Sequence, residues 1–348
     1  MHTWRRERKD RGRRSPVKLG VPLATIDNEM KRRSANPPVQ GIDERTMKIA
    51  ANLTVLDEVE LIEDAIRHLR AIGVDVISVT DLGSTDGTLN VLAKFASDPD
   101  VRIFSITAEN NPDPANYGMQ SYRKTVEVFD PDWVLLVDAD EFWIPRSGDI
   151  KQTAALQWAQ TLSVKRFNVP PVQGRPFLRE NLSPSHYGDL LLVARGAAEA
   201  WDKVPYRKNM PWIMATIMPK IMTKPAVAAD IGRGSHRVTS ISGQEPQTAT
   251  PDDLLIAHVP FSTRERFFRK VKNIERSLAG YGHLLVGLEA WHWKHWLKRL
   301  HEGRLGEEYE RQILTSAELQ KAMDFGVIRS AAAYFEKPEM PSSRGGSR

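Results

Sequence analysis

From Met47 onward the sequence alternates short apolar runs with amphipathic runs, and this alternation restricts the fold more than any other feature. The apolar runs have the length of strands, and the longer runs between them have the three- and four-residue spacing of helices. Strands that alternate with helices in this way form parallel βαβ units, whose sheet is covered on both faces. We therefore expect an α/β fold, with a Rossmann-like and mostly parallel sheet flanked by helices. The expected strands are 47–56, 74–81, 101–106 and 133–138, and the expected helices are 57–73, 83–98 and 117–130.

Acidic residues follow the second and fourth expected strands, at the edge where parallel sheets bind ligands. Asp81 ends the second strand, and Asp138 ends the fourth, with Asp140 two residues further on. Side chains alternate along a strand, so Asp138 and Asp140 point the same way if the extended conformation continues. Two carboxylates this close repel each other unless a cation lies between them or one keeps its proton. The pattern therefore predicts a Mg²⁺ or Mn²⁺ site, which phosphate oxygens commonly complete.

A structural role explains some of these residues equally well. An Asp after a strand is often a turn former, and Ser84 or Asp86 would cap a helix that begins near Thr88. Each motif alone is weak evidence for a ligand site, and the two in this order on a βαβ framework are more specific. The same alternation turns Glu141 away from the expected metal, so we assign it to supporting the turn or the metal ligands.

Three short motifs, after the first, second and fourth expected strands, carry a resemblance to a known family. They are the pair Asp57 and Glu58, the stretch "DLGSTDGT" at 81–88 and the stretch "DADEF" at 138–142. In these motifs the chain resembles the family 2 glycosyltransferases of GT-A fold. Further similarity lies in "LLIAHVPFSTRERFFRKV" and "WHWKHWLKRLHEGRLGEEYERQIL", so the resemblance covers about residues 47–335. Asp57 is a departure, because the related branch usually has Asn there.

The resemblance implies a hexosyltransferase that moves a sugar from a nucleotide-diphosphate sugar to an acceptor hydroxyl and inverts the anomeric carbon. Asp138 and Asp140 would form a DxD motif that holds Mn²⁺ or Mg²⁺ against the diphosphate. A divalent cation there would stabilise the charge that develops on the departing nucleoside diphosphate. The acceptor, whether a glycan, a lipid or a small molecule, is not indicated. The residues implied to bind the nucleotide sugar are Asp57, Glu58, Asp81, Ser84, Asp86 and Asp138.

An inverting enzyme also needs a base for the acceptor proton, and the sequence offers several candidates. We expect Asp230 to be this base, with Asp202 and Glu199 as competitors. His258, which ends an apolar run, is the expected third metal ligand, followed by His236. A lone His after an apolar strand is equally typical of a hydrogen-bonded core residue.

Four basic residues follow His258 on an expected helix. They would either contact the phosphates or form a solvated helix face, and for most of them we favour the solvated face. They are Arg264, Arg266, Arg269 and Lys270.

The charge of the chain divides it into segments. Residues 1–46 hold 12 Lys and Arg against 6 Asp and Glu, with no sustained apolar period, so we expect a disordered basic tail. Contact with nucleic acid or an anionic membrane would suit this charge. We favour a solvated extension, with Met47 as an alternative start. We then expect a GT-A domain at 47–282, a helical region at 283–335 and a second disordered tail at 336–348.

Composition narrows the chemistry and the expected location. The chain has 0 Cys, which excludes disulfides and thiolate catalysis. No apolar run reaches the roughly 18 residues of a membrane span, and no apolar h-region follows the basic start. We therefore expect a cytoplasmic protein. Trp beside Lys and Arg in 284–301 would suit peripheral membrane contact, but we favour a helix packed on the catalytic domain.

Three other functions remain as alternatives. A haloacid-type phosphatase would have its nucleophile near the domain start and Thr or Val after its second Asp, where this chain has Glu141. A nucleotidyltransferase of related fold would need a Gly-rich basic loop after the first strand, and "ANLTVLDEVE" has neither Gly nor Lys. A nucleic-acid-binding protein would act through the basic tail. We expect no specific nucleic-acid partner.

Overall fold

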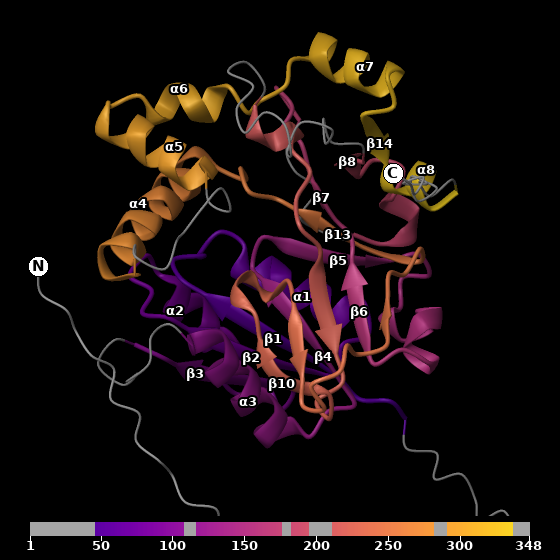
Figure 1. The fold of residues 1–348 in the computed structure, drawn as a ribbon. Coiled ribbons are helices and arrows are strands. Elements are labelled where there is room, and N and C mark those ends of the chain that lie inside the picture. The colour runs from indigo at the N-terminus through magenta and orange to yellow at the C-terminus, as the bar shows by residue number, and fades with distance from the viewer. Residues whose placement is uncertain (1–45, 108–115, 176–181, 195–210, 282–290, 337–348) are drawn as a thin grey trace, which may run out of the picture. The chain divides into compact units, whose positions relative to one another are not determined.

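The structure is a computed structural model, and it describes residues 46–107, 116–175, 182–194, 211–281 and 291–336 (Figure 1). All of these except residue 46 belong to the compact unit Met47–Arg348. Apart from Thr46 and Glu336, the expected tails lie outside the described residues, as does the start of the Trp-containing segment. The helices are α1 Ile62–Ala71, α2 Thr88–Leu92, α3 Tyr117–Phe129, α4 Arg264–Tyr281, α5 Trp291–His301, α6 Leu305–Glu310, α7 Ser316–Asp324 and α8 Ala331–Glu336.

A seven-stranded, mostly parallel sheet forms the centre of the fold, in the order β12-β6-β9-β4-β1-β2-β3. β1 pairs in parallel with β2 and β4, β2 pairs in parallel with β3, and β9 is antiparallel to β4 and β6. The expected α/β fold is confirmed. The strands are β1 Ile49–Val55, β2 Val76–Asp81, β3 Val101–Ser105, β4 Trp133–Asp138, β5 Glu141–Pro145, β6 Thr161–Val164, β7 Arg166–Asn168, β8 Leu191–Val193, β9 Lys220–Thr223, β10 Ala228–Ile231, β11 Val238–Ser240, β12 Thr248–Ala249, β13 Leu254–His258 and β14 Ile328–Ser330.

Helices cover both faces of this sheet. Successive side chains of each strand point to opposite sides, so each strand contributes to a packed cluster on each face. On one face Leu53 of β1 joins a buried cluster with Ile62 and Ile66 of α1. On the other face Ala50 of the same strand packs with Met119 of α3. The apolar strands of the sequence are therefore buried from both sides, as the βαβ pattern predicts.

The chain crosses from one side of β1 to the other between β3 and β4. β3 lies at one edge beyond β2, whereas β4 pairs with the opposite side of β1. Ligands of open α/β sheets bind outside the carboxyl ends of strands at such a reversal of strand order. The residues that follow β1 and β4 therefore occupy the favoured position for a site.

A second sheet, ordered β5-β13-β7, carries residues from distant parts of the chain to the end of β4. β5 begins directly after the turn that follows β4, and β13 runs antiparallel to it. In this register His258, the last residue of β13, lies opposite Glu141 on one side and Asn168 on the other. The short sheet thus brings a histidine beside the acidic turn.

The C-terminal helices α4, α5 and α6 pack against one another (Figure 1). Trp296 of α5 is 2% exposed, and its ring lies 5.2 Å from Phe267 of α4 and 5.4 Å from Trp212. Trp291 and Trp293 are partly buried against the same cluster. Among the described helices, none has both the length and the apolar character that a bilayer span requires.

Two expected helices are shorter in the structure than their apolar patterns suggested. The helix expected at 57–73 begins only at Ile62, and Asp57 has a left-handed φ of 58°. The helix expected at 83–98 is limited to α2, followed by a 3-10 turn at Ala93–Phe95. The missing first turns form two loops at the carboxyl edge of the sheet.

We expect His68 of α1 to make the free energy of unfolding decrease measurably in acid. Its Nε2 lies 2.7 Å from the carbonyl oxygen of Trp143, and burial lowers its pKa to about 4. The unfolded chain, with a His pKa of about 6.5, takes up this proton first as pH falls. The free energy of unfolding therefore decreases from pH 6.5 towards 4, with about 2 kcal/mol lost by pH 5 through this residue.

The measurement is urea unfolding at pH 7 and pH 5 of the unmodified chain and of His68→Gln. The Gln amide still donates a hydrogen bond and does not titrate, so its decrease should be smaller by about 2 kcal/mol. Equal decreases in the two proteins would contradict the assignment.

Candidate active site

The acidic residues singled out in the sequence gather at the carboxyl edge of the main sheet. Asp57 and Glu58 follow β1, Asp81 ends β2 and Asp138 ends β4. Asp140 lies in the turn between β4 and β5, where its side chain is almost fully buried. Strands β1 and β4 are neighbours, so the loops that follow them meet at the reversal of strand order.

Arg266 of α4 connects two of these loops. Its guanidinium donates to both carboxylate oxygens of Glu58, at 2.6 and 2.9 Å, and to Oδ2 of Asp140 at 2.9 Å. The Arg266 side chain is only 1% exposed. Lys270, one helical turn further on, places Nζ 2.6 Å from the same Asp140 oxygen. Two cations of α4 therefore compensate the buried carboxylate of Asp140.

A second group of charges surrounds Asp138. Nζ of Lys220, from β9, lies 2.7 Å from Oδ2 of Asp138 and 3.3 Å from Oε2 of Glu141. Glu141 also pairs with Arg166 of β7, and it accepts the backbone N–H of Asp138 at 3.1 Å. Glu141 thus supports the turn and holds Lys220 in place. The expected alternation is wrong, because residues 139–140 form a turn: Asp138 and Glu141 share Lys220, whereas Asp140 contacts the cations of α4. The Asp138 side chain is 46% exposed, so it is the more accessible of the two expected metal ligands.

These pairings set the protonation of the two aspartates. Burial alone would raise the pKa of Asp140, but Lys270 and Arg266 outweigh it and hold that pKa well below its ordinary value. Desolvation by the surrounding protein acts to raise the pKa of Asp138 even though its side chain is 46% exposed, and Lys220 outweighs it and lowers that pKa below its ordinary value. Both carboxylates are therefore charged at neutral pH and can act as cation ligands.

The partly buried Glu58 and the buried Glu141 behave differently from the two aspartates. Burial raises the pKa of Glu58, and Arg266 opposes only part of this effect. Burial also raises the pKa of Glu141 despite the nearby ammonium of Lys220. The cations thus stabilise charge on the aspartates more than on the glutamates.

His258 presents an unprotonated nitrogen to Asp140. The amide nitrogen of Asn168 donates to the carbonyl oxygens of Ile213 and Ala215, at 3.0 and 3.3 Å, so its Oδ1 faces His258. Nδ1 of His258 lies 2.8 Å from that oxygen and must carry the proton. Burial lowers the pKa of His258 to about 4, so the ring is neutral and Nε2 keeps a lone pair. This nitrogen lies 3.6 Å from Oδ2 of Asp140.

The chemistry of this donor set fits a divalent cation. Asp138 and Asp140 supply carboxylate oxygens and His258 supplies an imidazole lone pair, which together suit Mn²⁺. In the structure Arg266 and Lys270 already compensate the charge of the Asp140 carboxylate that this lone pair faces. Within the described part of the chain, no group of three or more His, Asp and Glu already stands in metal-binding geometry. Binding would require Lys270 to release the Asp140 oxygen.

Asp81, Ser84 and Asp86 shape the turn after β2. Oδ2 of Asp81 accepts the backbone N–H of Gly83 at 2.9 Å and that of Ser84 at 3.2 Å. Oδ1 of Asp86 accepts the backbone N–H of Thr88 at 3.0 Å, at the start of α2. The turn contacts of Asp81 are of the kind that the sequence also allowed. The expected cap is wrong in its residue, because Gly87 is the N-cap of α2, Asp86 lies one residue before it, and Ser84 accepts the N–H of Asp57 instead. A nucleotide contact by the same side chains stays a prediction.

Asp57 holds the loop after β1 against the loop after β2. Its Oδ1 accepts the backbone N–H of Thr85 at 2.6 Å, and its own N–H donates to Oγ of Ser84 at 2.9 Å. Asp tolerates a positive φ better than most residues, so the departure from Asn suits this position. The half-exposed Arg276 of α4 pairs with Oδ2 of Asp57 at 2.9 Å.

The candidate bases lie elsewhere or outside the described residues. Asp230 is exposed on β10, opposite Thr239 of β11, and no described contact joins it to the acidic turn. Asp202 and Glu199 lie outside the described residues. Burial, together with the nearby charge of Arg166, lowers the pKa of His236 to about 4. The identity of the base stays a prediction.

His236 and the remaining basic residues of α4 have other neighbours. Nδ1 of His236 lies 2.6 Å from the carbonyl oxygen of Pro219, directly before Lys220. Arg264 is exposed, with its guanidinium 5.4 Å from the ring centre of Phe268. Arg269 pairs with Glu60 and lies 3.4 Å from Asp86. Of the four basic residues, only Arg266 and Lys270 contact Asp140.

Three residues of the site were missed in the sequence. Lys220 and Arg166 come from short strands that lie far from the acidic motif along the chain. Asn168 ends β7 and orients His258. The one available signal was Lys220, a cation placed beside the apolar residues of "KIMT".

Comparison with known proteins gives matches only among solved structures. No protein-family model matches the chain. No curated protein matches it either. It is similar to S. aureus TarS 1–349 in complex with UDP, with 19% identity, a TM-score of 0.29 and 38% of each chain covered.

Two further structures were matched over longer segments. S. aureus TarS 1–349 without a named ligand has 15% identity and a TM-score of 0.32, over 59% of this chain and 60% of that one. The third is Mycobacterium tuberculosis glucosyl-3-phosphoglycerate synthase with Mn²⁺, UDP and glucosyl-3-phosphoglycerate. It has 16% identity and a TM-score of 0.30, over 55% of this chain and 62% of that one. The chain thus spans less than two thirds of the length of each structure.

We expect replacement of Arg266 to lower the free energy of unfolding by a large amount. Arg266→Met leaves the buried carboxylate of Asp140 and the partly buried carboxylate of Glu58 without their guanidinium, so unfolding should require about 3 to 5 kcal/mol less free energy. Lys272→Met, which removes an exposed cation from the same helix, should change stability by less than about 0.5 kcal/mol. Urea unfolding at pH 7 measures both. Similar values for the two variants would contradict the role of Arg266.

The tautomer of His258 can be observed directly. Long-range ¹H–¹⁵N NMR at pH 7 should show a neutral ring with the proton on Nδ1 and none on Nε2. In Asn168→Leu the acceptor for Nδ1 is lost, so the two tautomers should be present in a mixture. A wild-type ring protonated on Nε2 would contradict the arrangement.

Proposed function

We propose that this chain is a metal-dependent glycosyltransferase of GT-A type, which transfers a sugar from a nucleotide-diphosphate sugar to an acceptor hydroxyl with inversion. The observation that supports the proposal is the 3.6 Å distance between Nε2 of His258 and Oδ2 of Asp140, in the turn that directly follows Asp138 at the carboxyl edge of the sheet. Two carboxylates two residues apart, with an unprotonated imidazole beside one of them, suit a Mn²⁺ or Mg²⁺ ion that binds a diphosphate.

The residues of the site would share the work of holding the donor. A divalent ion on Asp138, Asp140 and His258 would neutralise charge on the nucleoside diphosphate that leaves. Lys270, whose side chain is 30% exposed, would turn from Asp140 to the phosphate oxygens when the ion binds. Arg266 would stay in place and keep Asp140 oriented.

The loops after β1 and β2 would form the nucleotide side of the site. Asp57 and Asp81 follow adjacent parallel strands, and hydrogen bonds between their loops hold them in one arrangement. We propose that Asp81, with Asp57 and Glu58, lines the pocket for the base and ribose. Ser84 and Asp86 would shape this pocket through the turn contacts described above.

The acceptor hydroxyl must lose a proton as it attacks the anomeric carbon. Asp230 remains our proposed base and Asp202 the alternative, on the sequence argument alone. No specific observation in the structure favours a nucleotidyltransferase or a nucleic-acid-binding protein.

Asp140→Asn tests the metal assignment. The amide removes a charged ligand, so Mn²⁺-dependent binding of UDP or GDP should weaken by at least about 100-fold, measured by calorimetry. Asp132→Asn is the matched control. Asp132 directly precedes β4, at the end of that strand far from Asp140, where it accepts the backbone N–H of Lys48. The control should bind as the unmodified chain does.

Folding is checked separately by circular dichroism, since Asn at position 140 leaves Arg266 and Lys270 with a weaker partner. If Asp140→Asn does not fold, the half-exposed Asp138 provides the second variant, Asp138→Asn, with the same expected loss. Unchanged nucleotide affinity in a folded variant would overturn the metal assignment.

A further inference from the structure

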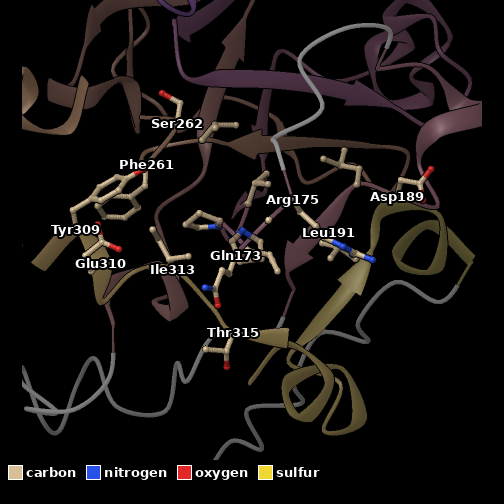
Figure 2. Close-up of a pocket in the computed structure, with 17 residues that line it drawn as sticks. Gln173, Arg175, Asp189, Leu191, Phe261, Ser262, Tyr309, Glu310, Ile313 and Thr315 are labelled. Atoms are coloured by element: carbon tan, nitrogen blue, oxygen red, sulfur yellow. The ribbon is translucent and has the colours of Figure 1, made fainter. Parts of the chain in front are cut away.

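A cavity of about 520 Å³ lies next to the acidic turn, and none of the residues assigned above lines it (Figure 2). Its walls come from the segment 169–175 after β7, the residues after β13, the start of β8 and the segment 309–315 at the end of α6. Its volume lies within the roughly 300 to 1,000 Å³ typical of small-molecule sites. The cavity is therefore large enough for a small ligand.

Backbone hydrogen bonds connect this cavity to the proposed metal ligands. Val259, which lines the cavity, donates its N–H to the carbonyl oxygen of Asp140 at 2.8 Å. Val169, which also lines it, donates to the carbonyl oxygen of His258 at 2.8 Å. The cavity therefore borders the backbone segments that carry Asp140 and His258.

The cavity has an apolar, buried part and a charged, exposed part. The exposed residues include Arg175, Asp189 and Glu310, and none of the three forms an ion pair with another described residue. Figure 2 shows Asp189 and Glu310 on opposite sides of the cavity, with Arg175 between them. The buried apolar lining residues are Val169, Val172, Leu190, Val259 and Phe261.

This composition argues for a neutral ligand. One guanidinium against two carboxylates gives the lining a net negative charge, which disfavours a phosphorylated or carboxylated acceptor. Carboxylates accept hydrogen bonds from hydroxyl groups, and the apolar part can pack against C–H groups or an aromatic substituent. Both features match a neutral glycoside.

We propose that this cavity is the acceptor site and that the acceptor is a neutral sugar or glycoside. The inference rests on the proposed function. In the transfer, the acceptor oxygen forms a bond to the anomeric carbon of the donor as the bond from that carbon to the diphosphate oxygen breaks. The electron pair of the broken bond leaves with the nucleoside diphosphate, and the acceptor proton passes to the base.

The test measures binding of two kinds of probe by ligand-observed NMR with Mn²⁺-free protein. The neutral probes are p-nitrophenyl glycosides of glucose, galactose, mannose and N-acetylglucosamine, and the anionic probe is glucose 6-phosphate. At least one neutral glycoside should bind the unmodified chain, and glucose 6-phosphate should bind at least about tenfold more weakly.

Variants connect this binding to the cavity. Ile313→Trp places a large side chain in the cavity and should weaken glycoside binding at least tenfold. Ile241→Trp, at a position 65% exposed and outside the cavity, is the matched control and should have no effect. Asp189→Asn combined with Glu310→Gln removes two exposed charges without filling the cavity. It should weaken the neutral glycosides at least threefold and reduce the discrimination against glucose 6-phosphate.

Nucleotide binding separates failure of this inference from failure of the proposed function. Calorimetry with Mn²⁺ and UDP or GDP should give the same affinity, within twofold, for all these variants. Glycoside binding that is absent, unaffected by both cavity variants or weaker than that of glucose 6-phosphate would overturn the acceptor assignment. Absence of nucleotide binding in the unmodified chain would instead overturn the proposed function.

Discussion

The buried guanidinium of Arg266 is the interaction on which the candidate site depends. It joins Glu58, from the loop after β1, to Asp140, from the turn after β4, and it belongs to a helix more than a hundred residues further along the chain. Removal of a partner from such a buried group leaves an uncompensated charge, which is far more costly than loss of a surface pair. Arg266 therefore couples the C-terminal helices to the acidic edge of the sheet.

The three-stranded sheet β5-β13-β7 brings a histidine, an amide and a carboxylate to the site. The antiparallel pairing of β13 with β5 and its parallel pairing with β7 bring His258, Asn168 and Glu141 together from three separate segments. Glu141 holds Lys220 and the turn, whereas Asn168 fixes the proton of His258. The residues that follow these strands line the cavity, so one sheet connects the proposed metal ligands to the proposed acceptor site.

Much of the fold could be predicted from the sequence, whereas only part of the candidate site could. The first four strands were found from their apolar runs, because burial on both faces leaves a strong signal in the sequence. The starts of α1 and α2 were placed too early, because acidic and polar residues near Asp57 and Asp86 suit a helix but bond between the loops instead. Lys220, Arg166 and Asn168 were missed, because cations and amides on short strands look like ordinary surface residues until their partners are known.

The sequence by itself determined the α/β class, the positions of the first four strands along the chain and the acidic motifs at their ends, since these follow from local periodicity and from the rule that parallel strands share one carboxyl edge. Only the tertiary structure decided which cation meets which carboxylate and which nitrogen of His258 carries the proton. It also decided that the cavity lies beside the acidic turn. Those contacts join segments from 25 to more than 120 residues apart, and no local pattern encodes pairings at that separation.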